Sequence, residues 1–195
     1  MCGLQLVLQK HLIDPEFGPM VRKLFLPEKG QKWGALDYSS QEPRLTVHYA
    51  HKTNQPGAKE AVENYNLNEN MDYHQMVADL AGISRKHAKT INLGLAYGMG
   101  QVKLCASLGL PTEKVTDKKG LNRLIQGSAA DMTKLAMRNL WQEGFIPLHQ
   151  MHDELDFSFE TKEQADKCVE IMEQCLPLSV PVVVDAEFGN TWADA

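Results

Sequence analysis

The stretch from 145 to 159, Phe-Ile-Pro-Leu-His-Gln-Met-His-Asp-Glu-Leu-Asp-Phe-Ser-Phe, carries the clearest structural signal in the chain. Apolar residues run along both of its ends, and His152, Asp153 and Glu154 interrupt them at the centre. This pattern predicts two strands, 145–151 and 155–159, which form a β-hairpin with carboxylates at its tip. Two acidic residues on a turn are often merely solvated, but rigid strands on both sides would hold them at a fixed point.

A second short strand is predicted from Trp33 to Asp37, because an apolar run follows turn residues and ends on a carboxylate. A helix is predicted directly after it, over 42–52. An Asp at such a junction is most often a turn or helix cap, but it is also a suitable ligand for a hard cation. If this strand lies beside the hairpin, Asp37 and Asp153 converge and can bridge two divalent ions about 3.5–4 Å apart.

The stretch 85–98, Arg-Lys-His-Ala-Lys-Thr-Ile-Asn-Leu-Gly-Leu-Ala-Tyr-Gly, is predicted to form a helix that ends near Tyr97. Arg85, Lys89, Leu93 and Tyr97 are spaced by four and therefore share one helix face. Two cations followed by an apolar and an aromatic side chain fit a triphosphate followed by a sugar and a base. The alternative is a solvated basic stripe over a half-buried aromatic ring.

The remaining pattern mixes helices and strands without regular β-α-β alternation, which favours an α+β domain with an antiparallel sheet. Apolar residues at helical spacing and polar breaks between them define the other elements. Helices are predicted near 58–64 and over 72–81, 129–143 and 161–175, and a buried strand is predicted over 180–184.

Composition excludes several classes of protein. The 195 residues are 43% hydrophobic and 23% charged, as in an ordinary globular domain, and no apolar run reaches the roughly 20 residues of a membrane helix. Four cysteines lack CxxC spacing, so we expect reduced structural thiols, no zinc site and a cytoplasmic location. The net charge of −5 is unusual for a nucleic-acid enzyme, but residues 84–119 are locally basic.

Four motifs in this order resemble those of the family A DNA polymerases, the group of bacterial DNA polymerase I and many phage replicative enzymes. Asp37–Arg44 resembles motif A, Arg85–Gly98 motif B and Gln150–Leu155 motif C, and Asn122–Asp131 resembles the segment between B and C. The match covers nearly the whole chain. It implies a template-directed DNA polymerase core with an antiparallel palm sheet, flanking helices and a small helical fingers insertion.

The resemblance also implies a role for particular residues. Two Mg²⁺ ions would be bound by Asp37, Asp153 and the backbone carbonyl of Tyr38. The catalytic residues would be Asp37, Asp153, Glu154 and Lys89, of which Lys89 would protonate the leaving pyrophosphate. Residues that bind the deoxynucleoside triphosphate (dNTP) would be Arg85, Lys89, His74, Tyr97, Leu93, Gln41 and Glu42, with Glu42 excluding a ribose 2′-hydroxyl. Primer and template would contact Lys10, Arg44, Asn122, Gln126, Gln150 and His152.

The same resemblance predicts the domain organisation. Residues 1–50 and 120–195 would form the palm and residues 51–119 reduced fingers, with the thumb and the exonuclease domain absent. Two positions depart from the family pattern: Leu93 stands where Phe or Tyr is usual, and Lys10 where Arg is usual. The connection from Gly98 to Asn122 is also far shorter than in the family.

Several functions are compatible with these motifs. The chain is either an active DNA polymerase core, with primer-template DNA and dNTP as partners, or a fragment of a split or degenerate polymerase. A fragment would need a second polymerase chain that supplies a thumb. A two-metal phosphodiesterase would have no use for the face around Arg85 and Tyr97, and Glu42 disfavours a single-subunit RNA polymerase.

Overall fold

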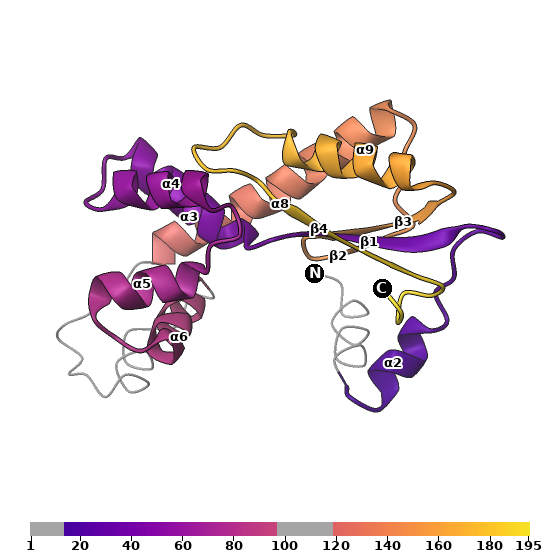
Figure 1. Cartoon of the computed structure of the whole chain (residues 1–195), viewed down its shortest axis with the longest axis horizontal. Coiled ribbons are helices and arrows are strands. Elements are labelled where there is room, and N and C mark those ends of the chain that lie inside the picture. Colours follow the sequence, from indigo (N-terminus) through magenta and orange to yellow (C-terminus); the bar gives the residue numbers. More distant parts are fainter. Residues whose placement is uncertain (1–13, 97–118) are drawn as a thin grey trace. The chain divides into compact units, whose positions relative to one another are not determined.

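A computed structural model describes residues 14–96 and 119–195 and divides the chain into two compact units (Figure 1). Within the described residues, the sheet unit consists of 14–39, 133–175 and 184–195. The helical unit consists of 40–96, 119–132 and 176–183. In the parts of the chain that the structure describes, none of the helices has both the length and the apolar character that crossing a bilayer requires.

The sheet unit is built on four antiparallel strands in the order β2-β3-β1-β4. This arrangement confirms the predicted α+β class with an antiparallel sheet. The strand that ends near Asp37 pairs directly with the hairpin, so that Asp37 lies opposite Glu154 on one side and opposite Asp185 on the other. The elements of this unit are α2 (Phe17–Arg22), β1 (Lys32–Tyr38), β2 (His149–Met151), β3 (Glu154–Phe159), α9 (Lys162–Glu173) and β4 (Val184–Gly189), together with the C-terminal part of α8 (Lys119–Gln142).

Alternation along the strands gives the sheet two different faces. Leu36, Leu155 and Phe157 are buried and share one face, which α9 covers, whereas α2 lies on the opposite side of the sheet (Figure 1). Tyr38 belongs to the α9 face, where its hydroxyl donates a hydrogen bond of 3.0 Å to the carbonyl of Met172. The other face carries the carboxylates.

The helical unit consists of α3 (Gln41–Lys52), α4 (Ala58–Leu67), α5 (Tyr73–Ala81), α6 (Arg85–Ala96) and the N-terminal part of α8. Its main core contains Val47, Ala61, Tyr65, Met76 and Val180. The Asp72 side chain caps α5 by accepting hydrogen bonds from two backbone N–H groups of its first turn, which is why that helix begins where it does.

The predicted buried strand over 180–184 is wrong. Val180 is buried in the core of the helical unit, and β4 begins only at Val184. Pro181 has no backbone N–H to contribute to a strand ladder, so an apolar run that contains it does not extend the sheet. β4 is an edge strand whose residues are largely exposed.

Two further predicted boundaries are corrected. The first arm of the hairpin is a strand only over His149–Met151, because Pro147 interrupts the ladder upstream. The helix predicted over 129–143 begins at Lys119, since Ile125 and Ala129 pack against Leu45 and offset the poor helix propensity of the preceding residues.

The two units do not share the boundaries predicted for palm and fingers. Residues 40–50 and 120–132 belong to the helical unit, although the sequence places them in the palm. A compact unit need not coincide with a functional subdomain, so the palm and fingers division stays a prediction.

Candidate active site

The carboxylates of the sheet unit gather where β1 ends beside the hairpin. Asp37 is on β1, Glu154 is the first residue of β3, and Asp153 lies in the turn between β2 and β3. His152 makes this turn tight by adopting a left-handed backbone conformation, with φ of 56°. Since Asp37 pairs with Glu154, the two acidic sequence motifs meet at one point of the sheet.

The cluster of carboxylates changes the acidity of its members. Burial, followed by the charge of Asp153 and then of Asp185, raises the pKa of Asp37 from 3.8 to about 6. Burial also raises the pKa of Asp153. Ionising several buried carboxyl groups this close together costs free energy, which a bound cation would offset. Together they form an oxygen-rich, negatively charged site, which favours a hard divalent cation.

The described residues do not form a complete metal cage by themselves. Among them, no group of three His, Cys, Asp or Glu side chains is placed to hold one ion. Mg²⁺ in phosphoryl-transfer sites is usually bound by one or two protein carboxylates together with substrate phosphates and water. Asp37 and Asp153, with the neighbouring carbonyl of Tyr38, therefore fit Mg²⁺ as a site that substrate completes.

Sequence reasoning missed four residues beside this cluster. Asp156 is fully buried. Its Oδ1 accepts a hydrogen bond of 3.1 Å from the Trp33 indole, and its Oδ2 lies 3.0 Å from Nδ1 of His149. The Trp192 indole donates a bond of 2.9 Å to Glu154. An Asp among the apolar residues of a predicted strand was the one signal that could have pointed to this network.

Burial and the charge of Asp156 raise the pKa of Glu154 to about 7, although the bond from Trp192 opposes that shift. The acid that resembles the family's second motif C carboxylate thus lies in the field of a fully buried carboxylate on the same strand.

In the helical unit, the structure brings together three of the residues predicted to bind a triphosphate. His74 lies on α5, and Arg85 and Lys89 lie one turn apart on α6. Burial is the largest cause of the lowered pKa of the His74 imidazole, and the nearby charges of Arg85 and Lys89 lower it further. Nδ1 of His74 is 3.1 Å from the amide nitrogen of Asn92. Because an amide nitrogen only donates, this bond places the proton of a neutral imidazole on Nε2.

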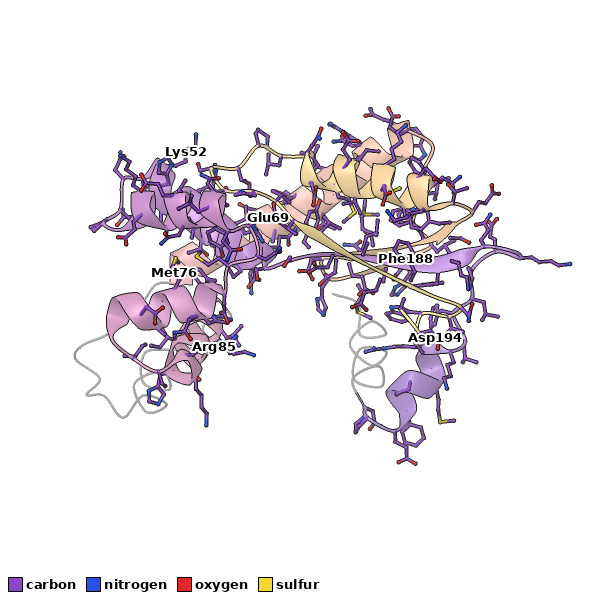
Figure 2. The ribbon with its side chains drawn as sticks, in the orientation of Figure 1. Lys52, Glu69, Met76, Arg85, Phe188 and Asp194 are labelled. Carbon is purple, nitrogen blue, oxygen red and sulfur yellow. The ribbon has the colours of Figure 1, made fainter. Side chains whose placement is uncertain are left out.

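Arg85 forms an ion pair with Asp72 in this arrangement. Its Nε and Nη2 atoms both lie 2.6 Å from Oδ2 of Asp72, the residue that caps α5, and this contact holds the pKa of Asp72 below its usual range. Both side chains are about half exposed, so the ion pair is weak and can be exchanged for another anion. Figure 2 labels Arg85 on α6.

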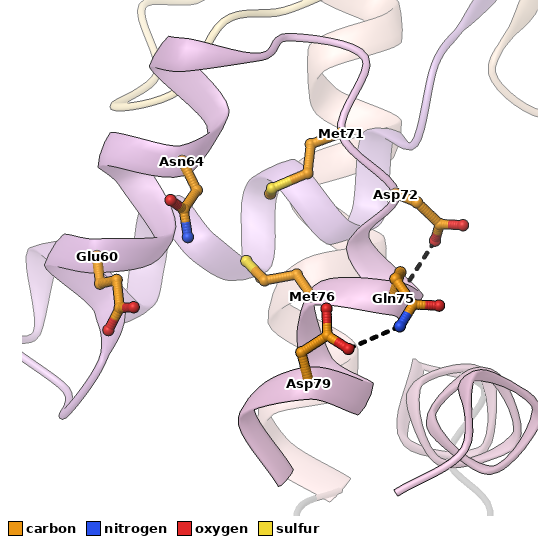
Figure 3. A pocket seen from close by; sticks show the side chains of 7 residues that line it. All are labelled: Glu60, Asn64, Met71, Asp72, Gln75, Met76 and Asp79. Atoms are coloured by element: carbon orange, nitrogen blue, oxygen red, sulfur yellow. Dashed lines mark hydrogen bonds between the residues drawn. The ribbon is translucent and has the colours of Figure 1, made fainter. Parts of the chain in front are cut away.

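A pocket of about 310 Å³ lies between α4 and α5 of the same unit (Figure 3). Three carboxylates, two amides and two methionine side chains line it, and the negative charge of the carboxylates would repel a triphosphate. The residues that line it are Glu60, Asn64, Met71, Asp72, Gln75, Met76 and Asp79.

Arg44 occupies a position that favours a structural role over the predicted DNA contact. Only 3% of its surface is exposed, its guanidinium donates to the carbonyls of Pro181 at 2.7 Å and Glu69 at 2.6 Å, and it stacks over Tyr65. Gln41 is also buried. Neither side chain reaches solvent as a substrate contact would require.

The other predicted residues are distributed over both units. Glu42 is half-buried on α3, Leu93 is exposed on α6, Gln126 is exposed on α8, and Gln150 and His152 are exposed near the hairpin tip. Asn122 belongs to α8. Lys10 and Tyr97 lie outside the described residues. Cys168 and Cys175 are buried, as expected for structural thiols.

Comparison with known proteins supplies the context for this geometry. A family model described as DNA polymerase family A matches residues 5–118 and 112–194. The DNA-directed DNA polymerase of Pseudomonas phage M6 is 34% identical over 95% of this chain and 42% of its own length. The thermostable DNA polymerase I of Thermus aquaticus is 26% identical over 96% of this chain and 30% of its own length.

A solved structure gives the same result for the fold. The POL domain of Pol1 from M. smegmatis, in complex with DNA primer-template and dNTP, superposes with a TM-score of 0.74 at 25% identity, over 96% of this chain and 44% of that one. The chain spans less than half the length of these relatives. The alignment with the phage M6 protein is 276 residues long, whereas 95% of this chain is about 185 residues, so roughly 90 aligned positions have no counterpart here. The family match over nearly the whole chain is nevertheless decisive: this chain belongs to DNA polymerase family A.

Proposed function

We propose that this chain is the catalytic core of a template-directed DNA polymerase, which adds deoxynucleotides to a primer 3′ end by two-metal phosphoryl transfer. The observation that carries the proposal is the pairing of Asp37 with Glu154, the residue next to Asp153, in a member of this family. The named relatives are DNA polymerases, and the solved relative holds primer-template DNA and dNTP. A cytoplasmic location in a bacterial or phage-infected cell belongs to the same proposal.

In this proposal, different residues of the chain have different roles in nucleotide addition. Asp37, Asp153 and the Tyr38 carbonyl would hold two Mg²⁺ ions, which would lower the pKa of the primer hydroxyl and offset charge on the leaving pyrophosphate. Arg85, Lys89 and His74 bind the triphosphate, and Lys89 gives the pyrophosphate a proton. The steric gate, Glu42, excludes a ribose 2′-hydroxyl.

The remaining predicted residues complete the proposal. Glu154 supports the primer end. Leu93 and Tyr97 complete the nucleotide contact, whereas its burial weighs against Gln41. Lys10, Asn122, Gln126, Gln150 and His152 contact primer and template, whereas its burial weighs against Arg44.

Primer extension tests this function. A 5′-labelled primer-template, Mg²⁺ and all four dNTPs are incubated with the wild type, with Asp153→Asn and with Glu28→Gln, an exposed carboxylate of the same unit. We expect extension by the wild type and by the control variant, and a loss of at least about a hundredfold in Asp153→Asn. Equal extension by Asp153→Asn would refute the assignment, and shortening of the primer without dNTP would favour a phosphodiesterase.

A second candidate is a core that needs a partner chain for synthesis. The observation that favours it is the share of the relatives that this chain spans, 42% of the phage M6 protein. In that case the chain alone binds dNTP without extending a primer, and a second polymerase chain that supplies a thumb restores extension. Full activity of the chain alone would exclude this candidate.

A further inference from the structure

Trp192 is fixed in place from several directions. Its ring is 5% exposed, lies 4.8 Å from the ring of His149 and 5.3 Å from that of Phe25, and carries the Arg22 guanidinium 5.5 Å from its centroid. Its backbone N–H donates to the carbonyl of Phe25 at 3.1 Å. A buried tryptophan held by its backbone and its ring has little rotameric freedom left, so the direction of its indole N–H is set by the fold.

That N–H points at Glu154. The bond from Nε1 to Oε1 is 2.9 Å long and joins residues 38 positions apart in the sequence. An indole nitrogen only donates, so the contact selects a carboxylate oxygen and favours the ionised form. A hydrogen bond to a charged group in a partly buried site is stronger than a neutral one.

Asp156 anchors the neighbouring part of the same network. It is fully buried two residues along β3, on the same face of the sheet as Glu154. Asp156 cannot move away, because the indole of Trp33 and the imidazole of His149 hold its two oxygens. The bond from Trp192 therefore fixes Glu154 beside a network whose other members are themselves held in place.

This network is difficult to explain by stability alone. A buried carboxylate beside a second carboxylate costs more desolvation and repulsion than an apolar side chain of the same volume. The aromatic side chains Trp33, Trp192 and Phe25 could pack without either acid. Asp156 satisfies the buried indole N–H of Trp33, but that need does not explain a second carboxylate, Glu154, beside it.

We infer that Trp192 is a positioning residue that holds the Glu154 carboxylate at the hairpin tip, beside Asp37 and Asp153, in one working orientation. The inference rests on the proposed polymerase function for its purpose. The geometry that it describes can be tested without catalysis.

A spectroscopic experiment tests the contact itself. The chain has three tryptophans, so a ¹H–¹⁵N spectrum of the full chain contains three indole signals, which single Trp→Phe variants assign. We expect Glu154→Gln to shift the Trp192 signal and to leave that of Trp141, which is 67% exposed, in place. We also expect added MgCl₂ to shift the Trp192 signal in the wild type more than in Glu154→Gln. An unmoved Trp192 signal in Glu154→Gln would overturn the inference.

A double-mutant cycle tests whether the contact between Trp192 and Glu154 affects the rate of nucleotide addition. Trp192→Phe keeps an aromatic ring and removes the N–H, and we expect it to lower kcat for single-nucleotide addition about tenfold with the KM for dNTP changed less than about twofold. In a Glu154→Gln background the same change should matter less than about twofold, because the partner is already altered. Trp141→Phe is the control and should leave kcat unchanged.

Equal losses in both backgrounds would mean that Trp192 acts through packing and would overturn the inference. If Trp192→Phe does not fold, the spectrum of Glu154→Gln still decides, since all three tryptophans are present in it. If neither the wild type nor any variant extends a primer, the proposed function fails, whereas the spectroscopic result separately decides whether Trp192 holds Glu154.

Discussion

Replacement of Asp37 by Asn should make the metal-free protein more stable at neutral pH, although it removes a residue proposed to bind metal. The folded protein raises the pKa of Asp37 from 3.8 to about 6 by burial and by the charges of Asp153 and Asp185. One pKa unit corresponds to about 1.4 kcal/mol, so the penalty for ionised Asp37 is at most about 3 kcal/mol. Asn has nearly the same shape and carries no charge.

The sign of the pH dependence follows from the direction of this shift. Because the folded pKa is the higher one, the folded protein keeps a proton that the unfolded chain has lost between about pH 4 and pH 6. The unfolding free energy of the wild type therefore falls as the pH rises through this window. The advantage of Asp37→Asn should be absent below about pH 4 and complete above about pH 6.

Urea unfolding in EDTA, followed by circular dichroism at about pH 4, 6 and 8, measures this difference. We expect a gain of about 1–3 kcal/mol for Asp37→Asn at the highest pH and a change within about 0.5 kcal/mol for the control Glu28→Gln. Mg²⁺ should stabilise the wild type and not Asp37→Asn. A variant that is no more stable at pH 8, or equally favoured at pH 4, would refute the electrostatic reasoning.

Three other predictions concern the helical unit. Glu42→Ala should raise the kcat/KM for ribonucleotides relative to deoxynucleotides by about tenfold or more in steady-state primer extension, and unchanged sugar selectivity would sink the steric-gate assignment. Asp72→Asn keeps an oxygen to cap α5 but releases Arg85, so titration with dNTP should give a KM lower by about two- to fivefold; a higher KM would mean that Asp72 aligns Arg85 instead of competing for it. Arg44→Met should lower the unfolding free energy by about 2 kcal/mol in urea, because the part-buried carbonyls of Glu69 and Pro181 lose their donor, and a stable variant with weakened DNA binding would restore the DNA-contact assignment.

Local patterns in the sequence were sufficient for the elements that bear the site. The apolar run that ends at Asp37 and the apolar arms around Asp153 predict β1 and the hairpin, and the mixed order of elements predicts the antiparallel sheet that the structure confirms. These features depend on neighbours within about ten residues, which is the range over which periodicity and turn signals act.

The features that could not be predicted depend on contacts between distant residues. Trp33 meets Asp156 across 123 positions, and Arg44 meets Pro181 across 137. The type and spacing of Asp156 and Arg44 in the sequence do not indicate these partners. The sequence therefore predicts a DNA contact for Arg44 and no role for Asp156. The strand prediction over 180–184 failed for the same reason, since Val180 packs in the core of the helical unit and the sheet begins only at Val184.

The left-handed backbone at His152 has a consequence for reading sequence variation at the hairpin tip. A φ of 56° is tolerated best by Gly and by a few polar residues such as Asn, Asp and His, whatever the side chain touches. A narrow choice of residues among natural homologues at this position would thus reflect backbone chirality as well as any DNA contact. Only His152→Gly and His152→Asn, which both accommodate the turn, separate the two pressures: a loss of extension in both would belong to the lost imidazole and not to the fold.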